Sequence, residues 1–149
     1  MGTDSDPRVS EAMPTEAWDR LKADETAVLV DVRTASEWSF VGCPDLSELG
    51  CSMHCIEWAK FPDMIPNPRF VEEVMEALDG QTPSQIFFIC RSGARSKSAA
   101  VAVENALGEK GVQSRCVNVA EGFEGDLNAK KHRGGLNGWK ARGLPWKQS

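Results

Sequence analysis

The chain has no hydrophobic run that approaches the roughly 20 residues a helix needs to cross a membrane. Its first ten residues, MGTDSDPRVS, have neither the basic start nor the apolar middle of a secretory signal. Its five cysteines have no regular spacing, so a complete disulfide framework is not expected and a reducing cytoplasm is the predicted location. Together these absences predict a protein without a membrane partner.

Basic residues are also few relative to acidic ones, because 17 Lys and Arg stand against 22 Asp and Glu, a net charge of −5. General nucleic-acid binding requires a basic surface, so no nucleic-acid partner is expected. What the sequence does have is a globular composition, 41% hydrophobic and 26% charged, over 149 residues. Residues 1–8 are predicted to be a disordered lead-in and residues 9–149 a single domain.

Helical patterns recur along this domain. Apolar residues at helical spacing and capping residues predict helices at residues 14–24, 34–40, 67–80 and 96–107, with a further short helix around Trp139 and Lys140. Thr34 is the expected N-cap of the second helix. In the third, Asn67 is the expected cap and Pro68 the first helical residue.

Between the helices lie short apolar stretches that predict strands, at residues 27–33 (AVLVDVR), 85–90 (QIFFIC) and 114–119 (SRCVNV). QIFFIC is apolar without alternation, so both of its faces are expected to be covered, as in a parallel sheet. Residues 42–66 are predicted to be a long irregular connection. Strands that alternate with helices predict an α/β domain, with a central, mostly parallel sheet flanked by helices on both faces.

A cysteine stands at the end of the predicted central strand. Cys90 closes QIFFIC, and the residues up to Arg95 must turn the chain before a helix that begins near Ser96. Ligands of open parallel α/β sheets gather where strands end and helices begin. Gly93 permits the positive φ that such a turn requires. Because the N–H groups of a tight loop and the positive end of the helix both attract anions, a Cys90 thiolate is expected to be stabilised there.

Two interpretations of Cys90 compete. A cysteine at a strand end is commonly a buried core residue. A structural cysteine, however, needs neither a glycine turn nor two neighbouring cations. The stretch RSGARS therefore favours a nucleophile that handles an anionic substrate or product.

The length of the loop distinguishes two chemistries. Tyrosine and dual-specificity phosphatases place an arginine six positions after their cysteine, and their wider loop encircles a phosphate. Arg95 comes only five positions after Cys90, so the smaller ring suits one added sulfur atom better than a phosphoryl group. A phosphatase would also need an acid to protonate the leaving group. Asp31, Glu121 and Asp126 are candidates, and no pattern selects among them.

Three motifs together carry a resemblance to a known family. LVDVRTASEW contains a strand-ending Asp-x-Arg followed by an acidic helix, CRSGARS provides a six-residue active-site loop, and GLNGWKARGLPW has a Gly-x-x-x-Trp-x-x-x-Gly-Leu-Pro ending. Over about residues 9–147 the chain resembles the single-domain rhodaneses, or thiosulfate sulfurtransferases. CRSGARS is the most specific of the three motifs.

The resemblance implies that Cys90 takes a sulfane sulfur from a small anionic donor such as thiosulfate, becomes a persulfide, and passes the sulfur to a thiol or cyanide. The persulfide would be held by the backbone amides of Arg91, Ser92, Gly93, Ala94, Arg95 and Ser96. The side chain of Arg91 is expected at the mouth of the site, and that of Arg95 either attracts the donor or pairs with a carboxylate. No cofactor and no metal are implied.

The resemblance also implies that Asp31 and Arg33 fix the loop from behind through ionic hydrogen bonds. An ordinary surface salt bridge between the two is the alternative.

Other functions stay open for the same loop. A persulfide carrier or sensor would pass its sulfur to a protein partner, and a cysteine-based phosphatase or arsenate-handling enzyme would bind a tetrahedral oxyanion. The segments VGCPDLSELGCSMHCIEW and NVAEGFEGDLNAKKHRGG depart from the family pattern, and both are predicted to reshape access to the site. The basic cluster KKHRGG around His132 is of a kind that usually forms a solvated face, and the alternative is that it adds positive potential near an anion site.

The remaining cysteines have more ordinary interpretations. Cys51, His54 and Cys55, with Cys43 upstream, suggest zinc, but structural zinc sites usually draw on two paired knuckles, so no metal site is predicted. A disulfide between one of these cysteines and oxidised Cys90 is the other alternative. Cys116 is predicted to lie in the core, and the five tryptophans to be packing residues.

Overall fold

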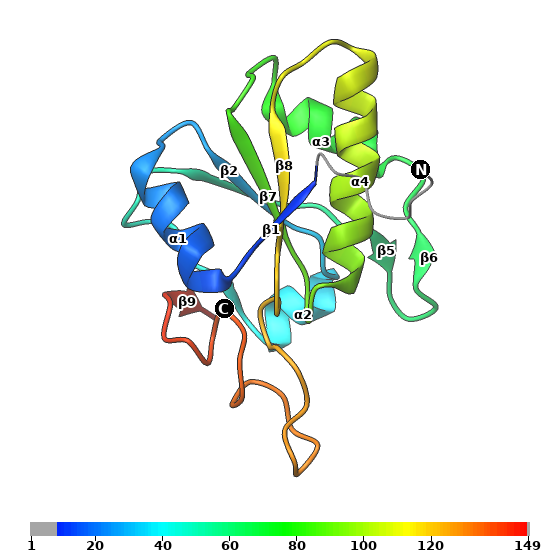
Figure 1. Ribbon diagram of the computed structural model, residues 1–149. Helices are drawn as coiled ribbons and strands as arrows, with labels where there is room; N and C mark the ends of the chain where they lie inside the picture. The colour runs from blue at the N-terminus through cyan, green and yellow to red at the C-terminus, as the bar shows by residue number, and fades with distance from the viewer. Residues whose placement is uncertain (1–8, 149) are drawn as a thin grey trace.

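A parallel sheet of five strands forms the centre of the computed structural model, which describes residues 9–148 (Figure 1). The predicted lead-in at residues 1–8 lies outside the described residues. The strands are β1 (Ser10–Ala12), β2 (Val28–Asp31), β4 (Ser52–Cys55), β7 (Gln85–Ile89) and β8 (Arg115–Val119). Their spatial order is β1-β8-β7-β2-β4, and every neighbouring pair is parallel.

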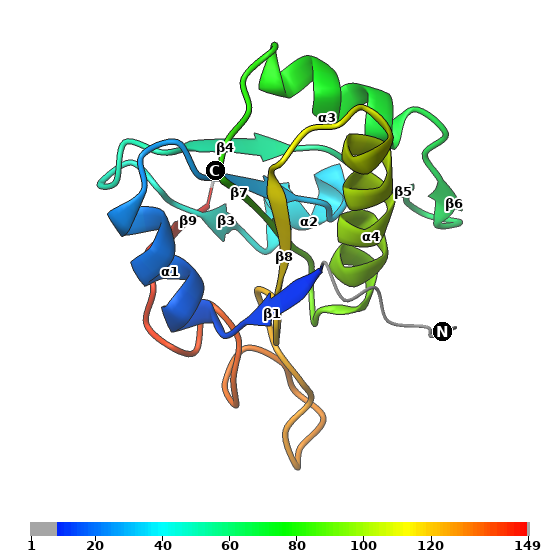
Figure 2. The same ribbon diagram turned by 45° about the horizontal axis from the view of Figure 1, so that its top comes forward.

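Helices cover both faces of this sheet. They are α1 (Pro14–Ala23), α2 (Ala35–Phe40), α3 (Phe70–Leu78) and α4 (Ala94–Glu109). Figures 1 and 2 show α3 and α4 on one side of the sheet and α1 on the other. The predicted α/β class with a parallel, doubly covered sheet is therefore confirmed. None of the described helices is long and apolar enough to cross a membrane.

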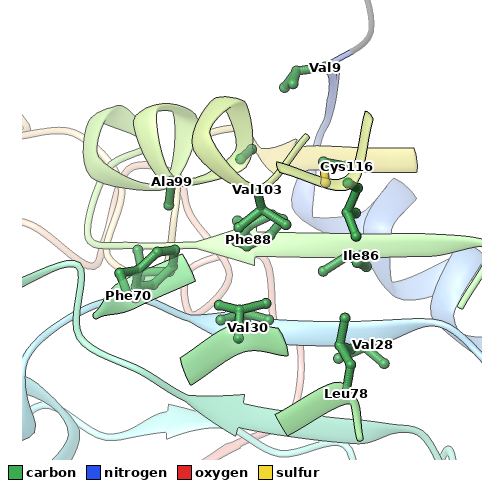
Figure 3. Close-up of a cluster of buried hydrophobic side chains, with 14 of the residues drawn as sticks. Val9, Val28, Val30, Phe70, Leu78, Ile86, Phe88, Ala99, Val103 and Cys116 are labelled. Atoms are coloured by element: carbon green, nitrogen blue, oxygen red, sulfur yellow. The ribbon is translucent and has the colours of Figure 1, made fainter. Parts of the chain in front are cut away.

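The core consists of two layers, because successive side chains of each strand point to opposite faces. Val28, Val30, Ile86 and Phe88 face α3 and α4, and Figure 3 shows them gathered with Phe70 of α3 and with Ala99 and Val103 of α4. The alternate residues of the same strands, Leu29, Phe87 and Ile89, pack against α1 and the C-terminal segment. Burial on both faces explains why QIFFIC is apolar without alternation.

Two small two-stranded sheets lie outside the central sheet. β3 (Cys43–Pro44) pairs antiparallel with β9 (Trp146–Lys147), and β5 (Ala59–Lys60) pairs antiparallel with β6 (Ile65–Pro66). The predicted irregular connection at residues 42–66 is thus wrong in part, because it contains β4, an edge strand of the central sheet, and the β5–β6 hairpin. β4 reads SMHC and is half exposed, so it has no apolar run to mark it.

Helix ends also differ from their predicted positions. α3 begins at Phe70, because Asn67 accepts hydrogen bonds from the backbone of Arg69 and Phe70 and so closes a turn ahead of the helix. The predicted capping role of Asn67 and the place of Pro68 inside the helix are therefore wrong. The short helix predicted around Trp139 is a series of turns instead. The capping of α2 by Thr34 is confirmed, since its hydroxyl accepts from the Glu37 N–H at 3.3 Å.

Removing the ring of Phe88 tests the packing of the core. Phe88→Ala leaves a cavity in a fully buried position and is expected to lower the free energy of unfolding by about 3–5 kcal/mol. Phe40 is 81% exposed, so Phe40→Ala should change it by less than about 0.5 kcal/mol. Chemical denaturation followed by circular dichroism measures both, and similar losses in the two variants would contradict this placement of Phe88.

Candidate functional site

Cys90 is the first residue after β7, at the edge where the parallel strands end. It continues the alternation of Ile86 and Phe88, so its side chain lies on the α3 and α4 side of the sheet, and it is 1% exposed. α4 begins at Ala94, two residues earlier than predicted, because Gly93 with φ +113° is already the N-cap. The thiol therefore lies beside the electropositive start of a 16-residue helix.

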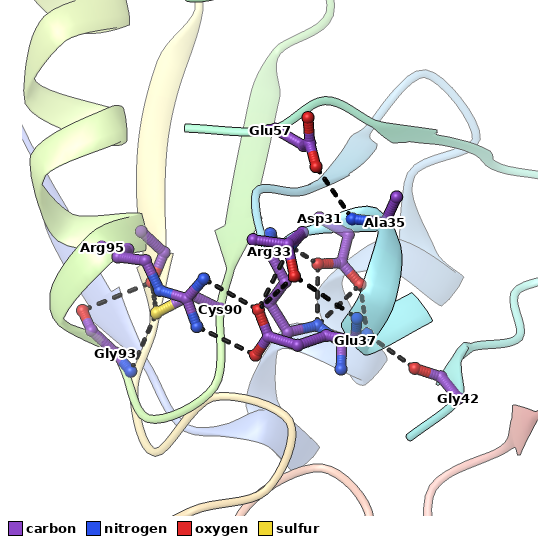
Figure 4. Close-up of polar contacts among 11 residues, drawn as sticks. Asp31, Arg33, Ala35, Glu37, Gly42, Glu57, Cys90, Gly93 and Arg95 are labelled. Atoms are coloured by element: carbon purple, nitrogen blue, oxygen red, sulfur yellow. Dashed lines mark hydrogen bonds and ion pairs between the residues drawn. The ribbon is translucent and has the colours of Figure 1, made fainter. Parts of the chain in front are cut away.

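Two polar groups contact the thiol sulfur (Figure 4). The backbone N–H of Gly93 lies 3.1 Å from Cys90 Sγ, and Ser96 Oγ lies 3.2 Å from it. Both groups belong to the loop and the first turn of α4, as the motif CRSGARS predicts. The further prediction that the amides of Arg91, Ser92, Ala94, Arg95 and Ser96 converge on a bound sulfur stays a prediction.

The hydroxyl of Ser96 has one hydrogen and three acceptors within reach. Asn118 Oδ1 lies at 2.6 Å, Cys90 Sγ at 3.2 Å and the Gly93 carbonyl at 3.3 Å. The hydroxyl can donate its hydrogen to one of these acceptors at a time, and its lone pairs can accept from a thiol. With a thiolate at Cys90, the hydroxyl can donate to the sulfur instead. Ser96 can thus bond to the thiol and to the thiolate in turn.

A chain of polar contacts holds Asn118 in place. Asn118 Nδ2 donates to Glu11 Oε1 at 3.0 Å and to the Gly93 carbonyl at 3.2 Å, and Glu11 Oε2 pairs with Lys97 Nζ at 2.9 Å. The register of β1 against β8 places Glu11 opposite Asn118. Sequence reasoning missed these contacts. An asparagine inside the apolar strand SRCVNV was the available signal, since a buried amide requires partners.

Arg95 pairs with a carboxylate, which is one of the two expectations for it. Its Nη1 and Nη2 donate to the two carboxylate oxygens of Glu37 at 2.9 and 3.0 Å (Figure 4). Glu37 Oε1 also accepts from the backbone N–H of Thr34 at 3.1 Å, so one carboxylate closes the start of α2 and binds the cysteine loop. Glu37 was missed, although the spacing Thr34-x-x-Glu37 is that of a capping box.

The loop that follows β8 lies directly against the cysteine loop. The N–H of Phe123 donates to the Cys90 carbonyl at 2.8 Å, and those of Glu124 and Gly125 donate to the Arg91 carbonyl at 3.0 and 3.1 Å. The prediction that this long segment lies near the site is confirmed. Arg91 itself is exposed, in keeping with its expected place at the mouth.

Asp31 and Arg33 form a pair that is fully buried, so the surface salt bridge offered as an alternative is wrong. Arg33 Nη2 lies 2.7 Å from Asp31 Oδ2 and also donates to the Gly42 carbonyl at 2.8 Å (Figure 4). The guanidinium lies over the ring of Phe123, 4.3 Å from its centroid. The pair contacts the cysteine loop through Phe123, whose N–H binds the Cys90 carbonyl, and the role predicted for it stays a prediction.

A family model described as the rhodanese-like domain matches residues 13–142. The chain belongs to this family. The match confirms the resemblance that the three motifs carry.

Relatives extend the match over nearly the whole chain. An uncharacterized protein of Rickettsia rickettsii is 36% identical over 132 residues, which cover 89% of this chain and 92% of that protein. The crystal structure of Rv0390 from M. tuberculosis is 41% identical, with a TM-score of 0.79, over 94% of this chain and 98% of that one. A Rhodopseudomonas palustris protein titled a possible tyrosine phosphatase, 18% identical with a TM-score of 0.50 over 93% of this chain and 85% of that one, shares the fold.

In this rhodanese-like domain, the three acids considered for a phosphatase are engaged elsewhere. Asp31 is buried against Arg33. Glu121 accepts from Arg142 Nη2 at 2.6 Å, and the hydrogen bonds of Arg142 lower the pKa of Glu121, so it is ionised at neutral pH. Asp126 is exposed and accepts from Asn137 at 3.1 Å. None of these contacts directs an acid toward Cys90.

Three of the other cysteines, Cys51, Cys55 and Cys116, lie apart from Cys90. Cys55 ends β4 opposite Asp31, which lies opposite Ile89, so two strand spacings, or about 10 Å, separate the Cα atoms of Cys55 and Ile89. A disulfide requires Cα atoms within about 7 Å, so Cys55 and Cys90 do not fit one without backbone movement. Cys51 lies at the end of the sheet where the strands begin, opposite to the end at which Cys90 lies, and it contacts the Leu21 carbonyl. Cys116 is fully buried in β8.

Desolvation raises the pKa of Cys55 to about 12, so this thiol is protonated at neutral pH. Within residues 9–148, no group of three or more His, Cys, Asp or Glu side chains is placed to hold a metal ion.

A pocket of about 690 Å³ opens beside the cysteine loop of the rhodanese-like domain. Arg91 and Arg95 line it together with residues of α2, of the turn between β5 and β6, and of the long loop after β8. The basic cluster KKHRGG contributes Lys131 and Arg133. Both segments that depart from the family pattern therefore supply or adjoin the walls of this pocket.

The close contact between Gly122 and the cysteine loop can be tested with two alanine substitutions. Gly122→Ala would place a Cβ 2.5 Å from the Cys90 carbonyl oxygen, whereas Gly111, at nearly the same φ (+72° against +68°), has nothing within 4 Å. Both variants carry left-handed strain of about 1–2 kcal/mol, and Gly122→Ala should lose a further 1–3 kcal/mol or so from the clash. Equal losses in denaturant titrations would argue against the contact.

The pairing of Glu37 with Arg95 predicts a pH dependence. Burial alone would raise the pKa of Glu37, but the hydrogen bonds and charge of Arg95 lower it below the ordinary 4.5. A carboxyl with a lowered folded pKa stabilises the protein above its unfolded pKa, and this contribution is lost as the pH falls through the folded value. We expect Glu37→Gln to destabilise the protein at neutral pH and to flatten the loss of stability below about pH 4.5.

Thermal unfolding midpoints measured across this range test the prediction. Glu72→Gln is the matched control, since Glu72 is 63% exposed and pairs with Arg69 on the surface. Wild-type acid sensitivity in the Glu37 variant would contradict the pairing.

Proposed function

We propose that the chain is a sulfurtransferase that moves a sulfane sulfur from an anionic donor to a thiophilic acceptor through a persulfide on Cys90. The observation that carries the proposal is the pair of contacts to Cys90 Sγ, from the Gly93 N–H and the Ser96 hydroxyl, at the start of α4. A thiolate and the persulfide derived from it both carry their charge at this position. Donors of hydrogen bonds and a helix N-terminus stabilise both species.

The first half of the proposed reaction transfers the outer sulfur of the donor. With thiosulfate, the Cys90 thiolate attacks the terminal sulfur, a new S–S bond forms, and the bond between the two thiosulfate sulfurs breaks so that sulfite leaves with its electron pair. Because Cys90 is 1% exposed, a donor contacts it only through its terminal sulfur atom. Arg91, exposed at the mouth, supplies positive charge for the anionic remainder.

The second half regenerates the enzyme. A thiolate or cyanide attacks the outer persulfide sulfur, and Cys90 leaves as the thiolate. Because the donor product departs before the acceptor reacts, the mechanism predicts ping-pong kinetics. Hydrolysis of a phosphate monoester has less support, because Asp31, Glu121 and Asp126 are engaged elsewhere and the loop is short. The proposed cytoplasmic setting, where thiols stay reduced, suits a persulfide enzyme.

Mass spectrometry tests the first half directly. The protein incubated with thiosulfate should gain the mass of one sulfur atom on the peptide that contains Cys90, and Cys90→Ser should gain none. Cys55→Ser, which alters another cysteine at the same edge of the sheet, should behave as the wild type. An unmodified Cys90 would overturn the proposal.

Steady-state kinetics then separate an enzyme from a carrier. Turnover of thiosulfate and cyanide to thiocyanate, with parallel lines in double-reciprocal plots, supports the sulfurtransferase. Persulfide formation without turnover would instead favour a carrier that serves a protein partner. Hydrolysis of p-nitrophenyl phosphate would revive the phosphatase.

A further inference from the structure

The side chain of Asn118 is held in one orientation. Asn118 lies opposite Phe88 of β7, and so on the same side of the sheet as Cys90. Its Nδ2 donates to Glu11 Oε1 at 3.0 Å and to the Gly93 carbonyl at 3.2 Å. A carboxylate and a carbonyl only accept hydrogen bonds, so the amide nitrogen must face them and the amide oxygen must face away.

The amide oxygen of Asn118 faces the hydroxyl of Ser96. Asn118 Oδ1 lies 2.6 Å from Ser96 Oγ, and both residues are buried, at 3% and 0% exposed. An amide oxygen carries no hydrogen, so the hydroxyl must supply the hydrogen of this contact. If that hydrogen turns elsewhere, the amide oxygen loses a short hydrogen bond in a place that water does not reach, which is unfavourable.

The same hydroxyl lies beside the nucleophile. Ser96 Oγ is 3.2 Å from Cys90 Sγ. A thiolate attracts a hydrogen-bond donor strongly because it is charged, whereas an uncharged sulfur is a weak acceptor. Ser96 has one hydroxyl hydrogen, so Asn118 Oδ1 and a Cys90 thiolate compete for it.

We propose that Asn118 is a positioning residue that holds the Ser96 hydrogen whenever Cys90 Sγ is uncharged and yields it when Sγ is a thiolate. In the persulfide the charge lies on the outer sulfur, so Sγ is uncharged and the hydroxyl returns to Asn118. The hydroxyl only rotates, and no covalent bond forms or breaks. The persulfide half of the inference rests on the proposed sulfurtransferase function, and the thiolate half does not.

This competition has a chemical consequence. Asn118 stabilises the states in which Sγ is uncharged, and it thereby raises the free energy of the thiolate relative to the persulfide. A less stabilised thiolate is a stronger nucleophile. Asn118 therefore favours the transfer of sulfur to Cys90, although it acts through Ser96 and does not touch the donor.

The ultraviolet absorbance of the thiolate tests the competition without any sulfur donor. Each protein is titrated with base, and the same protein with Cys90→Ser is subtracted so that only Cys90 contributes. Asn118→Leu keeps the volume and removes the amide. We expect it to move the midpoint of the titration to lower pH by about 0.7, a fivefold change that corresponds to one hydrogen bond. Asn118→Ala is the second variant and should move the midpoint in the same direction.

Ser96→Ala decides whether the effect passes through the hydroxyl. Without a hydroxyl to share, adding Asn118→Leu to Ser96→Ala should leave the midpoint within about 0.3 of its value in Ser96→Ala alone. Val117→Ala is the matched control, because Val117 is fully buried in the same strand but packs on the other side of the sheet. It should leave the midpoint at the wild-type value.

The charged groups around the cysteine loop are the same in all of these variants. They are Arg91, Glu124 and the ion pairs Arg95–Glu37, Lys97–Glu11, Arg33–Asp31 and Arg142–Glu121. Removal of the Asn118 amide frees one contact of Glu11, and any effect of this change persists when residue 96 is alanine. The comparison of the two backgrounds therefore separates the hydroxyl from the charges.

Sulfur transfer from thiosulfate gives a second measurement. At a pH where Cys90 is fully ionised, the rate constant for persulfide formation should be about twofold lower in Asn118→Leu, given a Brønsted coefficient of about 0.4–0.5. Well below the midpoint, the larger thiolate fraction should make the variant about twofold faster than the wild type. A loosened loop would instead slow the variant at every pH.

The possible failures are distinguishable. An unchanged midpoint in both Asn118 variants, or an equal shift with and without the Ser96 hydroxyl, would overturn the role of Asn118. If the midpoints move as expected but thiosulfate adds no sulfur to wild-type Cys90, the proposed function falls while the competition for the Ser96 hydrogen stands.

Discussion

The buried guanidinium of Arg33 connects the parts of the molecule on which the cysteine loop depends. It binds Asp31 at the end of β2, donates a hydrogen bond to the Gly42 carbonyl after α2, and lies over the ring of Phe123 in the loop after β8. Phe123 in turn donates its N–H to the Cys90 carbonyl. A buried charge requires a partner of opposite charge, and removal of that partner typically lowers the free energy of unfolding by several kcal/mol. These segments are therefore held together by a group that cannot be left unpaired.

A second ion pair, between Arg95 and Glu37, lies on the other side of the cysteine loop. Because of it, the two arginines of the loop have different roles. Arg95 binds both oxygens of Glu37, which also closes the first turn of α2. The charge of Arg95 is thereby compensated, and its main effect is to fix the loop against α2. Arg91 stays exposed at the mouth. The groups that contact Cys90 Sγ are then the Gly93 N–H and the Ser96 hydroxyl, at the start of α4.

Much of this arrangement could be predicted from the sequence, because its signals are local. The glycine turn of CRSGARS, the apolar strand before it and the capping of α2 by Thr34 all depend on adjacent residues. β1 and β4 could not be predicted from the sequence. Each is short and lies at an edge of the sheet, where a strand pairs with one neighbour and does not need an apolar pattern. The helix expected at Trp139 does not form, since Gly138 and Gly143 beside it adopt positive φ.

The contacts between distant residues were the hardest to predict. Glu11 and Asn118 are 107 residues apart and meet only because β1 pairs with β8. The pairing of Arg95 with Glu37 spans 58 residues, and no pattern within either segment names the partner. The one sequence pattern that pointed to Glu37 was its capping box with Thr34. This pattern places Glu37 at the start of α2 but does not identify the residue that pairs with it.

The cysteine loop and the pocket beside it have different origins in the sequence, and this difference bears on function. The loop is formed by a motif that resembles the family pattern, whereas the pocket owes Phe61, Leu127, Lys131 and Arg133 to the hairpin β5–β6 and to the long loop. In the proposed reaction the atoms that react at Cys90 are the same for every sulfur donor. The pocket walls, which come from connecting loops, would then set the donor preference without altering the chemistry.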